Sequence, residues 1–337
     1  MKLHYITYAA ENIIKTFTEI NHQEKKPIVL SKYASSMLHF NRDKYFLTEF
    51  SGDWAHEVNI AERELAFGKK TIDTKLGARA NMFVSPFFQL SLGAPSEENS
   101  GEVLVGTLGW TGNFRFTFEV DNKNELRVIS GINPYASEYN LPAKETFRTP
   151  DFYFTYSLNG KGGASRNFHD WARKYQIKKG DQTRMTLLNN WEATYFDFNE
   201  DKLVTIASKA KECGVELFVL DDGWFGKRTS DYAGLGDWYP NTDRLPNGIK
   251  GLAERIENLG MKFGLWIEPE MTNMDSDLYR NHPDWILHVP NRNSCECRHQ
   301  YEEIQKLSVH INHIHLRYND GILLLVYQQE VRQNNIL

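Results

Sequence analysis

Three segments of the chain end in clusters of amide, carboxylate and tryptophan side chains. The clusters are Asn189-Asn190-Trp191-Glu192, Asp221-Asp222-Gly223-Trp224 and Trp266-Ile267-Glu268-Pro269-Glu270. Carboxylates accept strong hydrogen bonds from hydroxyl groups, and indole rings offer apolar faces on which the C–H face of a sugar can stack. Taken together, the three clusters indicate a site for a neutral polyol.

Each cluster taken alone has a plainer interpretation. Two adjacent aspartates after a strand can form a turn or cap the next helix. Trp191 or Trp266 alone is more often a core residue than a ligand platform. Glu268 and Glu270 alternate across a strand end, so both cannot point inward. The hypothesis of a sugar site therefore depends on the clusters occurring together.

The sequence gives little support to a metal site or a cofactor. Asp221-Asp222 with Glu268 could be drawn as a divalent-metal site, but inward histidines are missing at the other strand ends. A second set of potential ligands lies nearer the C-terminus and consists of Cys295, Cys297, His310, His313 and His315. Its spacing matches no standard zinc pattern. We therefore expect neither a metal nor a cofactor.

The three clusters follow segments that are expected to be parallel strands. Residues 185–191, 215–220 and 262–267 are strand candidates, and helices are expected over residues 201–212 and 252–259. Strands that alternate with helices imply parallel pairing with right-handed crossovers. A doubly wound sheet and a TIM barrel both fit, but the absence of a Gly-rich phosphate loop argues against a nucleotide-binding sheet. In a TIM barrel, the active site lies at the C-terminal strand ends.

The part of the chain before these strands shows a different periodicity. Short alternating runs, such as residues 114–120, are separated there by Gly, Asn and Pro clusters. Regular short strands of this kind predict a β-sandwich. A short helix that carries Phe168 and Trp171 on one side is expected over residues 165–175.

The composition is typical of a globular protein and gives no sign of a nucleic-acid or membrane partner. The chain has 337 residues, enough for two domains, and 41% of them are hydrophobic and 25% charged. A net charge of −5 provides no electrostatic reason to expect either partner. No apolar run reaches membrane-spanning length, and residues 1–5 do not begin a signal peptide. Because Cys213, Cys295 and Cys297 make no disulfide framework, a cytoplasmic location is expected.

The clusters and their neighbours resemble family 36 glycoside hydrolases, which are largely α-galactosidases. In the β/α part, the resembling segments are residues 189–196, 217–226, 235–238, 260–271 and 275–285. In the β part, Gly109-Trp110-Thr111-Gly112-Asn113-Phe114 and Gly131-Ile132-Asn133-Pro134-Tyr135 are similar to the large N-terminal sandwich of that family. The resemblance extends from near Met1 to about Tyr301.

The resemblance implies an N-terminal β-sandwich followed by the first part of a TIM (β/α)8 barrel, with galactose bound at the barrel mouth. It implies that Asp221 and Asp222 bind the C4 and C6 hydroxyls, so that the axial C4 hydroxyl of galactose is preferred over that of glucose. Trp191 and Trp266 would wall the pocket, and Arg298 would also reach the sugar. The implied activity is hydrolysis of terminal α-galactosyl residues of the raffinose and melibiose type, by a retaining two-carboxylate mechanism.

The resemblance does not include the residues that would perform the chemistry. In the family, the nucleophile closes the fourth strand in a Lys-Trp-Asp context, and the acid/base aspartate lies further on. No Lys-Trp-Asp follows Tyr301, and the only Asp after it is Asp320. We therefore predict no catalytic residue in this chain. We expect it to be truncated at both ends and, because an open sheet exposes apolar surface and an edge, poorly soluble and inactive alone.

The predicted organisation has four parts. Residues 1–160 form a sandwich that lacks its N-terminal portion, residues 161–184 a linker helix region, and residues 185–301 a partial barrel of about three strands. Residues 302–337 form an aberrant tail, for which a frameshift is suspected. Members of the family are usually oligomers, so the intact protein is expected to be a homo-oligomer.

Two further functions stay open on the sequence alone. The first is a non-catalytic galactoside-binding remnant that kept Asp221, Asp222 and Trp266. The second is hydrolysis of another α-linked sugar, such as N-acetylgalactosamine. Binding of galactose without hydrolysis would favour the first, and the loops that decide the second are expected to lie outside this sequence.

Overall fold

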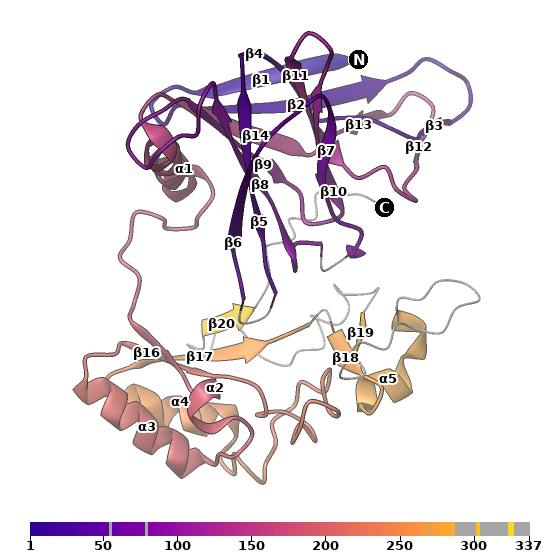
Figure 1. Ribbon diagram of the computed structural model, residues 1–337. Helices are drawn as coiled ribbons and strands as arrows, with labels where there is room; N and C mark the ends of the chain where they lie inside the picture. The colour runs from indigo at the N-terminus through magenta and orange to yellow at the C-terminus, as the bar shows by residue number, and fades with distance from the viewer. Residues whose placement is uncertain (54–55, 78–79, 270, 287–300, 304–322, 327–337) are drawn as a thin grey trace. The chain divides into compact units, whose positions relative to one another are not determined.

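The computed structural model describes residues 1–53, 56–77, 80–269, 271–286, 301–303 and 323–326. The chain forms two compact units, unit 1 (Met1–Gln182) and unit 2 (Thr183–Leu337), each with its own core (Figure 1). Unit 1 is built mainly from antiparallel strands, whereas unit 2 alternates parallel strands with helices. These are the two structural classes that the sequence patterns predict.

Unit 1 contains two main sheets, and all strand pairs within them are antiparallel. The eight-stranded sheet has the order β1 (Lys2–Tyr8), β2 (Ile13–Asn21), β14 (Asp151–Ser157), β9 (Val103–Gly109), β8 (Val84–Leu92), β5 (Tyr45–Ser51) and β6 (Asn59–Glu64), with β13 (Thr146–Arg148) beside β2. The four-stranded sheet has the order β4 (Ser36–Asn41), β11 (Glu125–Ile132), β10 (Phe114–Val120) and β7 (Gly68–Asp73). Two short strands, β3 (Ile28–Leu30) and β12 (Tyr139–Leu141), pair separately.

Strand β10 shows why this sequence forms a sandwich. Its apolar residues Phe114, Phe116 and Phe118 are buried, and the residues between them are only partly so. Phe88, on β8 of the larger sheet, packs edge-to-face against Phe116 and Phe118 with ring centroids 5.1 and 4.9 Å apart. Because side chains alternate between the faces of a strand, the aromatic residues of both sheets meet in one core. The predicted β-sandwich is confirmed.

Helix α1 (Gly160–Tyr175) covers the opposite face of the larger sheet. Ala164 lies there against Val103 and Val105 of β9, which alternate with the residues of the sandwich core. The Trp171 ring of α1 packs against Tyr153 of β14, with centroids 4.5 Å apart. Helix α1 therefore groups with unit 1, which extends to Gln182. The sequence predicts a linker helix region over residues 161–184.

The start of α1 lies earlier than the predicted residue 165, and close packing explains the difference. Gly160 has a φ of 68°, and a Cβ at Gly162 would collide with Glu98. The N–H groups of Lys161 and Gly162 donate to the carbonyl oxygens of Glu97 and Glu98, at 2.9 and 2.8 Å. These bonds satisfy donors that the first turn of a helix leaves open, so glycines of low helix propensity are accommodated in this turn.

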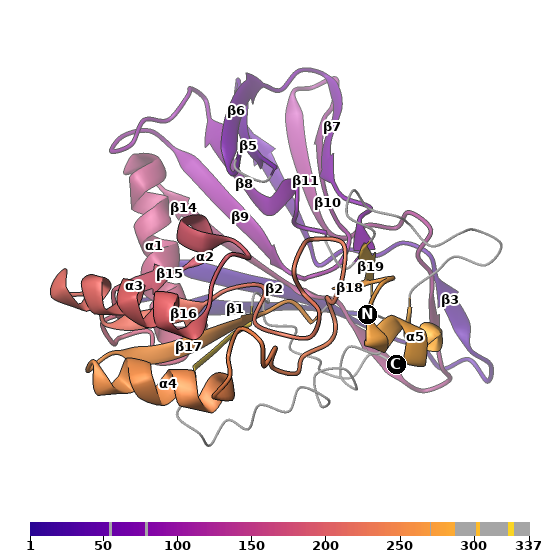
Figure 2. The same cartoon turned by 90° about the horizontal axis from the view of Figure 1, so that it is seen from below.

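The sheet of unit 2 has four parallel strands in chain order: β15 (Leu187–Asn189), β16 (Leu217–Leu220), β17 (Lys262–Ile267) and β20 (Leu323–Val326). Helix α3 (Glu200–Glu212) connects β15 to β16, and α4 (Gly248–Asn258) connects β16 to β17. Both helices lie on the same side of the sheet (Figures 1 and 2). A doubly wound sheet reverses its strand order and has helices on both faces. Unit 2 is therefore the beginning of a barrel-type β/α repeat, as the resemblance implies.

Helices α3 and α4 pack on the sheet through one apolar core. Its buried members include Leu203, Ala207, Phe218, Leu252, Ile256 and Phe263. Helix α3 begins one residue before its predicted start because the Asn199 side chain caps it, accepting a hydrogen bond from the Lys202 N–H at 2.9 Å. All of β16 is buried, which is the environment expected for a wholly apolar parallel strand.

Shorter elements surround this sheet. They are α2 (Trp191–Thr194), β18 (Met271–Asn273) paired with β19 (Tyr301–Glu303), α5 (Asp277–Asn281) and a 3-10 turn at Pro283–Trp285. Strand β20 comes from the region predicted to be an aberrant tail and adds a fourth strand to the three expected; the rest of residues 304–337 lies outside the described residues. None of the helices in the described ranges has the length and apolar character needed to cross a bilayer.

The sandwich core gives a first prediction. Phe88→Ala removes a fully buried ring that joins the two sheets, so we expect it to lower the free energy of unfolding of unit 1 by about 3–5 kcal/mol. Phe67→Ala is the matched control, because Phe67 is 77% exposed. Urea unfolding followed by hydrogen exchange in β8 and β10 peptides measures the difference. Equal effects of the two substitutions would contradict the assignment of Phe88 to the core.

Candidate functional site

The C-terminal ends of β15, β16 and β17 meet at one edge of the parallel sheet. Asn189 on β15 pairs with Val219 on β16, and Leu220 on β16 pairs with Leu265 on β17. Residues that directly follow these strands therefore lie near one another. In β/α barrels this edge carries the functional residues.

The Asn190 side chain connects the end of β15 to the end of β16. It is fully buried, and its Oδ1 accepts a hydrogen bond from the backbone N–H of Asp221 at 2.8 Å. Its Nδ2 donates to Thr194 Oγ1, also at 2.8 Å. Every polar group of a buried amide needs a partner, and these bonds hold the start of the Asp221-Asp222 segment in a fixed position.

Asp221 lies partly buried beside this amide and keeps open acceptor capacity. Its Oδ2 accepts a hydrogen bond from Asn189 Nδ2, and its Oδ1 accepts one from the Asp222 N–H at 2.7 Å. Asn189 is oriented in turn by the Trp191 N–H, which donates to its Oδ1 at 2.7 Å. A carboxylate has about four lone-pair directions, so two donors leave about two for a ligand. Burial raises the pKa of the Asp221 carboxyl.

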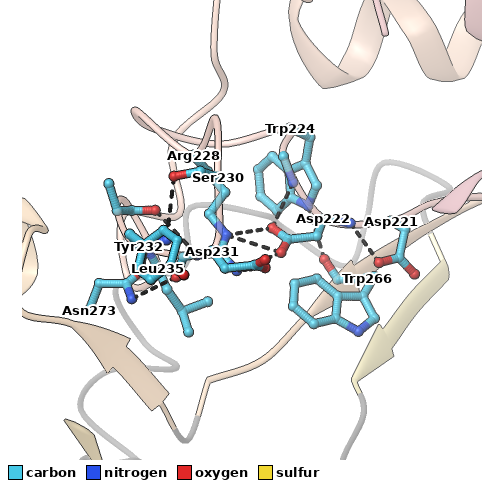
Figure 3. A network of polar contacts seen from close by, with 12 residues as sticks. Asp221, Asp222, Trp224, Arg228, Ser230, Asp231, Tyr232, Leu235, Trp266 and Asn273 are labelled. Carbon is cyan, nitrogen blue, oxygen red and sulfur yellow. Dashed lines mark hydrogen bonds and ion pairs between the residues drawn. The ribbon is translucent and has the colours of Figure 1, made fainter. Parts of the chain in front are cut away.

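Asp222 points in a different direction, into an internal ion pair with Arg228 (Figure 3). Arg228 Nε donates to both carboxylate oxygens at 2.9 and 3.0 Å, and Nη2 donates to Oδ2 at 2.7 Å. The N–H of Gly223 adds a bond to Oδ1 at 2.7 Å. The two side chains are only 8% and 2% exposed. Asp221 and Asp222 are equivalent by residue type and position in the sequence, and the structure distinguishes them.

Arg228 connects the loop after β16 to strand β18. Its Nη1 donates to Asn273 Oδ1 at 3.0 Å and to the Ala233 carbonyl at 3.3 Å. Asn273 also accepts a hydrogen bond from the Leu235 N–H at 3.0 Å and donates to the Asp231 carbonyl at 3.1 Å. Figure 3 shows Asn273, Asp231, Arg228 and Asp222 as one network, which continues to Asp221 through the Asp222 N–H. The network replaces the solvent that a buried charge would otherwise need.

The tryptophans of unit 2 divide into core residues and residues at the edge. Trp224 and Trp238 are buried, whereas Trp266 is only partly buried. Trp224 Nε1 donates to the Trp266 carbonyl at 2.9 Å (Figure 3). The Trp266 ring centroid lies 6.3 Å from that of Trp238. The buried indoles thus support a partly exposed one, and Trp266 keeps surface available for a ligand.

Trp191 is also only partly buried, at the first position of α2. Its ring packs edge-to-face against Tyr195 and Phe196, with centroid distances of 5.2 and 5.0 Å. The plainer interpretation of Trp191 and Trp266 as core residues therefore fits neither of them fully. Their partial exposure is what a pocket wall requires.

Four of the five predicted site residues lie within the described residues: Trp266 at the end of β17, Asp221 and Asp222 directly after β16, and Trp191 in α2, two residues after β15. The fifth, Arg298, lies outside the described residues. So do Glu270, Cys295, Cys297, His310, His313 and His315. Glu268 is partly buried after β17. Within the described residues, no three His, Cys, Asp or Glu side chains are grouped so as to hold a metal ion.

Sequence reasoning missed Arg228 and Asn273, which hold Asp222 in place. A signal for Arg228 was present, because a carboxylate predicted beside a buried strand needs a cationic partner and Arg228 follows Asp222 by one short turn. Asn273 offered no such signal, since it comes from a strand 45 residues later in the chain. Only the folded arrangement brings it to Arg228.

Asp237, which belongs to one of the resembling segments, has a structural role. It is 5% exposed, and its two carboxylate oxygens accept hydrogen bonds from the N–H groups of Asp277 and Leu278, both at 3.0 Å. These groups open helix α5, so Asp237 caps that helix. Burial raises its pKa. Asp237 is therefore not assigned to the candidate site.

Known proteins share the sequence patterns of both units of this chain. Residues 1–142 match the glycosyl hydrolase family 36 N-terminal domain, and residues 146–310 match the Melibiase family. The alpha-galactosidase AgaA of Geobacillus stearothermophilus is 41% identical over 301 residues, which are 88% of this chain and 41% of that protein. The alpha-galactosidase Mel36A of Lactobacillus acidophilus is 38% identical over 299 residues, with the same coverage of 88% and 41%.

Solved structures give the same result. The crystal structure of AgaA has a TM-score of 0.85 at 40% identity and covers 90% of this chain and 42% of its own. That of AgaB, from the same organism, has a TM-score of 0.86 at 40% identity and covers 92% and 43%. The fold is thus that of the barrel glycoside hydrolases that carry an N-terminal sandwich. Within that class, the chain belongs to glycosyl hydrolase family 36, and it spans about two fifths of the length of the curated relatives it matches.

The environment of Asp221 gives a second prediction. Burial raises its pKa above the ordinary 3.8, so the folded state binds the proton more tightly than the unfolded state does. The ionised carboxylate therefore costs stability above the folded pKa, and this cost vanishes below the unfolded pKa. Asp221→Asn, which removes the charge, should raise the urea midpoint of unit 2 at pH 7, and the gain should shrink as the pH falls below the raised folded pKa and be absent below the ordinary value.

The control for this prediction is Asp243→Asn, a substitution of an exposed aspartate in the same unit, which should change stability by less than about 0.5 kcal/mol at any pH. Intrinsic fluorescence during urea unfolding at several pH values provides the measurement. A gain for Asp221→Asn that is independent of pH would contradict the desolvation argument.

Proposed function

We propose that the protein acts in the hydrolysis of terminal α-galactosyl residues from raffinose- and melibiose-type α-galactosides, and that this chain contributes galactose-binding residues. The relatives AgaA and Mel36A are named alpha-galactosidases. Variants of the AgaA enzyme were solved in complex with raffinose and with stachyose. The observation that carries the proposal is the Asp221 carboxylate, partly buried, with open lone pairs, on the same sheet edge as Trp266.

The strand edge has the chemistry that a galactose ring needs. We assign Asp221 and Asp222 to the C4 and C6 hydroxyls, with Trp191 and Trp266 as walls for the C–H faces and Arg298 as a further contact. A carboxylate oxygen that is fixed in place accepts a hydrogen bond from an axial C4 hydroxyl and so stabilises the bound galactose. An equatorial hydroxyl, as in glucose, leaves the buried acceptor unpaired, and this penalty is the source of selectivity.

The described residues support binding rather than bond cleavage. A retaining glycosidase needs a nucleophile and an acid/base about 5–5.5 Å apart, on either side of the scissile bond. Among the described carboxylates near the edge, Asp221 and Asp222 are assigned to hydroxyl binding, and Asp237 caps a helix. Glu192 accepts a hydrogen bond from the Tyr195 hydroxyl at 3.0 Å, and Glu268 is partly buried after β17. We therefore expect this chain to bind galactose without turnover, while the nucleophile and acid/base act in the complete catalytic machinery of the family.

The proposal predicts that galactose binds this chain more tightly than glucose does. Asp221→Asn removes an ionised acceptor, and a hydrogen bond to a charged group contributes roughly 1.5–3 kcal/mol, so galactose affinity should fall on the order of 10- to 100-fold. Affinity of the unchanged chain should also fall at acidic pH, because burial raises the pKa of Asp221 and its protonation begins at a higher pH than usual. Isothermal titration calorimetry measures both effects.

Asp243→Asn is again the matched control and should bind galactose like the unchanged chain. Equal affinities for galactose and glucose would contradict the proposed site, as would an Asp221→Asn variant with full affinity. Release of nitrophenol from an aryl α-galactoside is the parallel assay. Turnover well above a blank would show that the assignment of these carboxylates to binding alone is wrong.

A further inference from the structure

We propose that Arg228 is a positioning residue for the sugar site. By hydrogen-bonding to one side of the Asp222 carboxylate, it fixes the single direction from which that carboxylate can accept a hydrogen bond from a substrate hydroxyl. This inference rests on the proposed function, since it concerns the same galactose site. It adds a residue that touches no sugar atom and acts through Asp222. Its readout is the contribution of one hydroxyl group to affinity.

Asp222 has few acceptor directions left for a ligand. Three donors, Arg228 Nε, Arg228 Nη2 and the Gly223 N–H, engage its two oxygens within 3.0 Å. A carboxylate has about four lone-pair directions, and the single Nε proton is shared between the two oxygens, so these three donors leave about one direction for a hydroxyl. Two of the three donors belong to one planar guanidinium. The rotation of the Asp222 carboxylate, and hence the open direction, is therefore set by Arg228.

Arg228 is itself held firmly. Its third nitrogen, Nη1, is bound by Asn273 of β18 and by the Ala233 carbonyl, and its guanidinium lies 5.6 Å from the Phe196 ring centroid. The residue is 1% exposed. A binding group is held within a fraction of an ångström only when the residues behind it are locked in turn, and this network supplies that support.

The charges around Asp222 also require a cation at this position. Asp222 is adjacent to Asp221 and nearly excluded from water, so two negative charges lie close together at a poorly solvated edge. Arg228 is the cation in direct contact with Asp222, and Arg244 is a second cation whose charge interacts with it. Asp231 lies 3.7 Å from Arg228 and shares its charge. A buried carboxylate is tolerated only when it is paired, and Arg228 provides the partner.

The geometry requires arginine rather than any cation. Nε and Nη2 form a fork that matches the two carboxylate oxygens, while Nη1 reaches the amide of Asn273. Lysine would keep the charge, but its single ammonium group cannot hold both oxygens and the amide at once. Arg228→Lys therefore keeps the positive charge beside Asp222 but removes the fork that fixes the rotation of its carboxylate. This substitution tests the proposal.

The experiment compares galactose, 4-deoxygalactose and 6-deoxygalactose by calorimetry on the unchanged chain, Asp221→Asn and Arg228→Lys. Each deoxy sugar reports the contribution of one hydroxyl as an affinity ratio to galactose, expected to be on the order of tenfold. The ratio that survives in Asp221→Asn belongs to Asp222. In Arg228→Lys that same ratio should fall to within about twofold of unity, while the ratio assigned to Asp221 is retained.

A merely structural role for Arg228 gives a different pattern. All three affinities of Arg228→Lys would then fall together with both ratios unchanged, and this result would overturn the proposal. The matched control is Arg255→Lys. Arg255 of α4 donates to the carboxylates of Glu200 and Asp201 at 2.7 and 2.9 Å and so makes a carboxylate pair of its own outside the Asp222 network, and both ratios should be retained.

Two further measurements keep the outcome decisive. Should Arg228→Lys fail to fold by circular dichroism, Asn273→Asp takes its place, because a second carboxylate on Nη1 competes for Arg228 and should reduce the same ratio. An unchanged Asp222 ratio in a folded Asn273→Asp variant would overturn the proposal. Absence of galactose binding by the unchanged chain refutes the proposed function itself, and is seen before any variant is compared.

Discussion

The buried ion pair between Asp222 and Arg228 is the interaction on which the organisation of unit 2 depends. The segment between β16 and α4 is long, and segments of that length seldom hold one conformation without internal fastening. In this protein the segment is held by the ion pair between Asp222 and Arg228, and Arg228 also donates a hydrogen bond to Asn273 on β18. Removing one partner of such a pair leaves an uncompensated buried charge, which typically costs about 3–5 kcal/mol. The pair therefore constrains both the loop and the carboxylate that the loop presents.

Next to this rigid pair lies a carboxylate that the fold tolerates at some cost. Asp221 is partly desolvated, and its two hydrogen bonds from Asn189 and the Asp222 N–H do not outweigh that burial. Carboxylate lone pairs without a donor, beside a partly exposed indole, raise the free energy of the empty site. Hydroxyl groups of a bound sugar would supply those donors and recover that free energy. Family membership, through similarity, and the strand-edge geometry, through its chemistry, both support the proposed galactose site.

Much of the fold could be predicted because its signals are local. The alternation of β10 predicted a sandwich strand, and the apolar run of β16 predicted a buried parallel strand. Other features have no local signal. The glycines at the start of α1 disfavour a helix, and only the carbonyls of Glu97 and Glu98 make one possible there.

For the candidate site, the sequence by itself determined which chemical groups follow each strand: the amides after β15, the carboxylates after β16 and the indole at the end of β17. Tertiary structure alone decided that Asp222 forms an ion pair with Arg228 and that Asn273 accepts a hydrogen bond from Arg228. It also decided that Trp224 is a core residue, whereas Trp266 lies partly exposed at the strand edge. The physical reason is that periodicity and strand ends are properties of neighbouring residues. Partners for a buried charge are chosen through space, by whichever donors the folded chain brings within hydrogen-bonding distance.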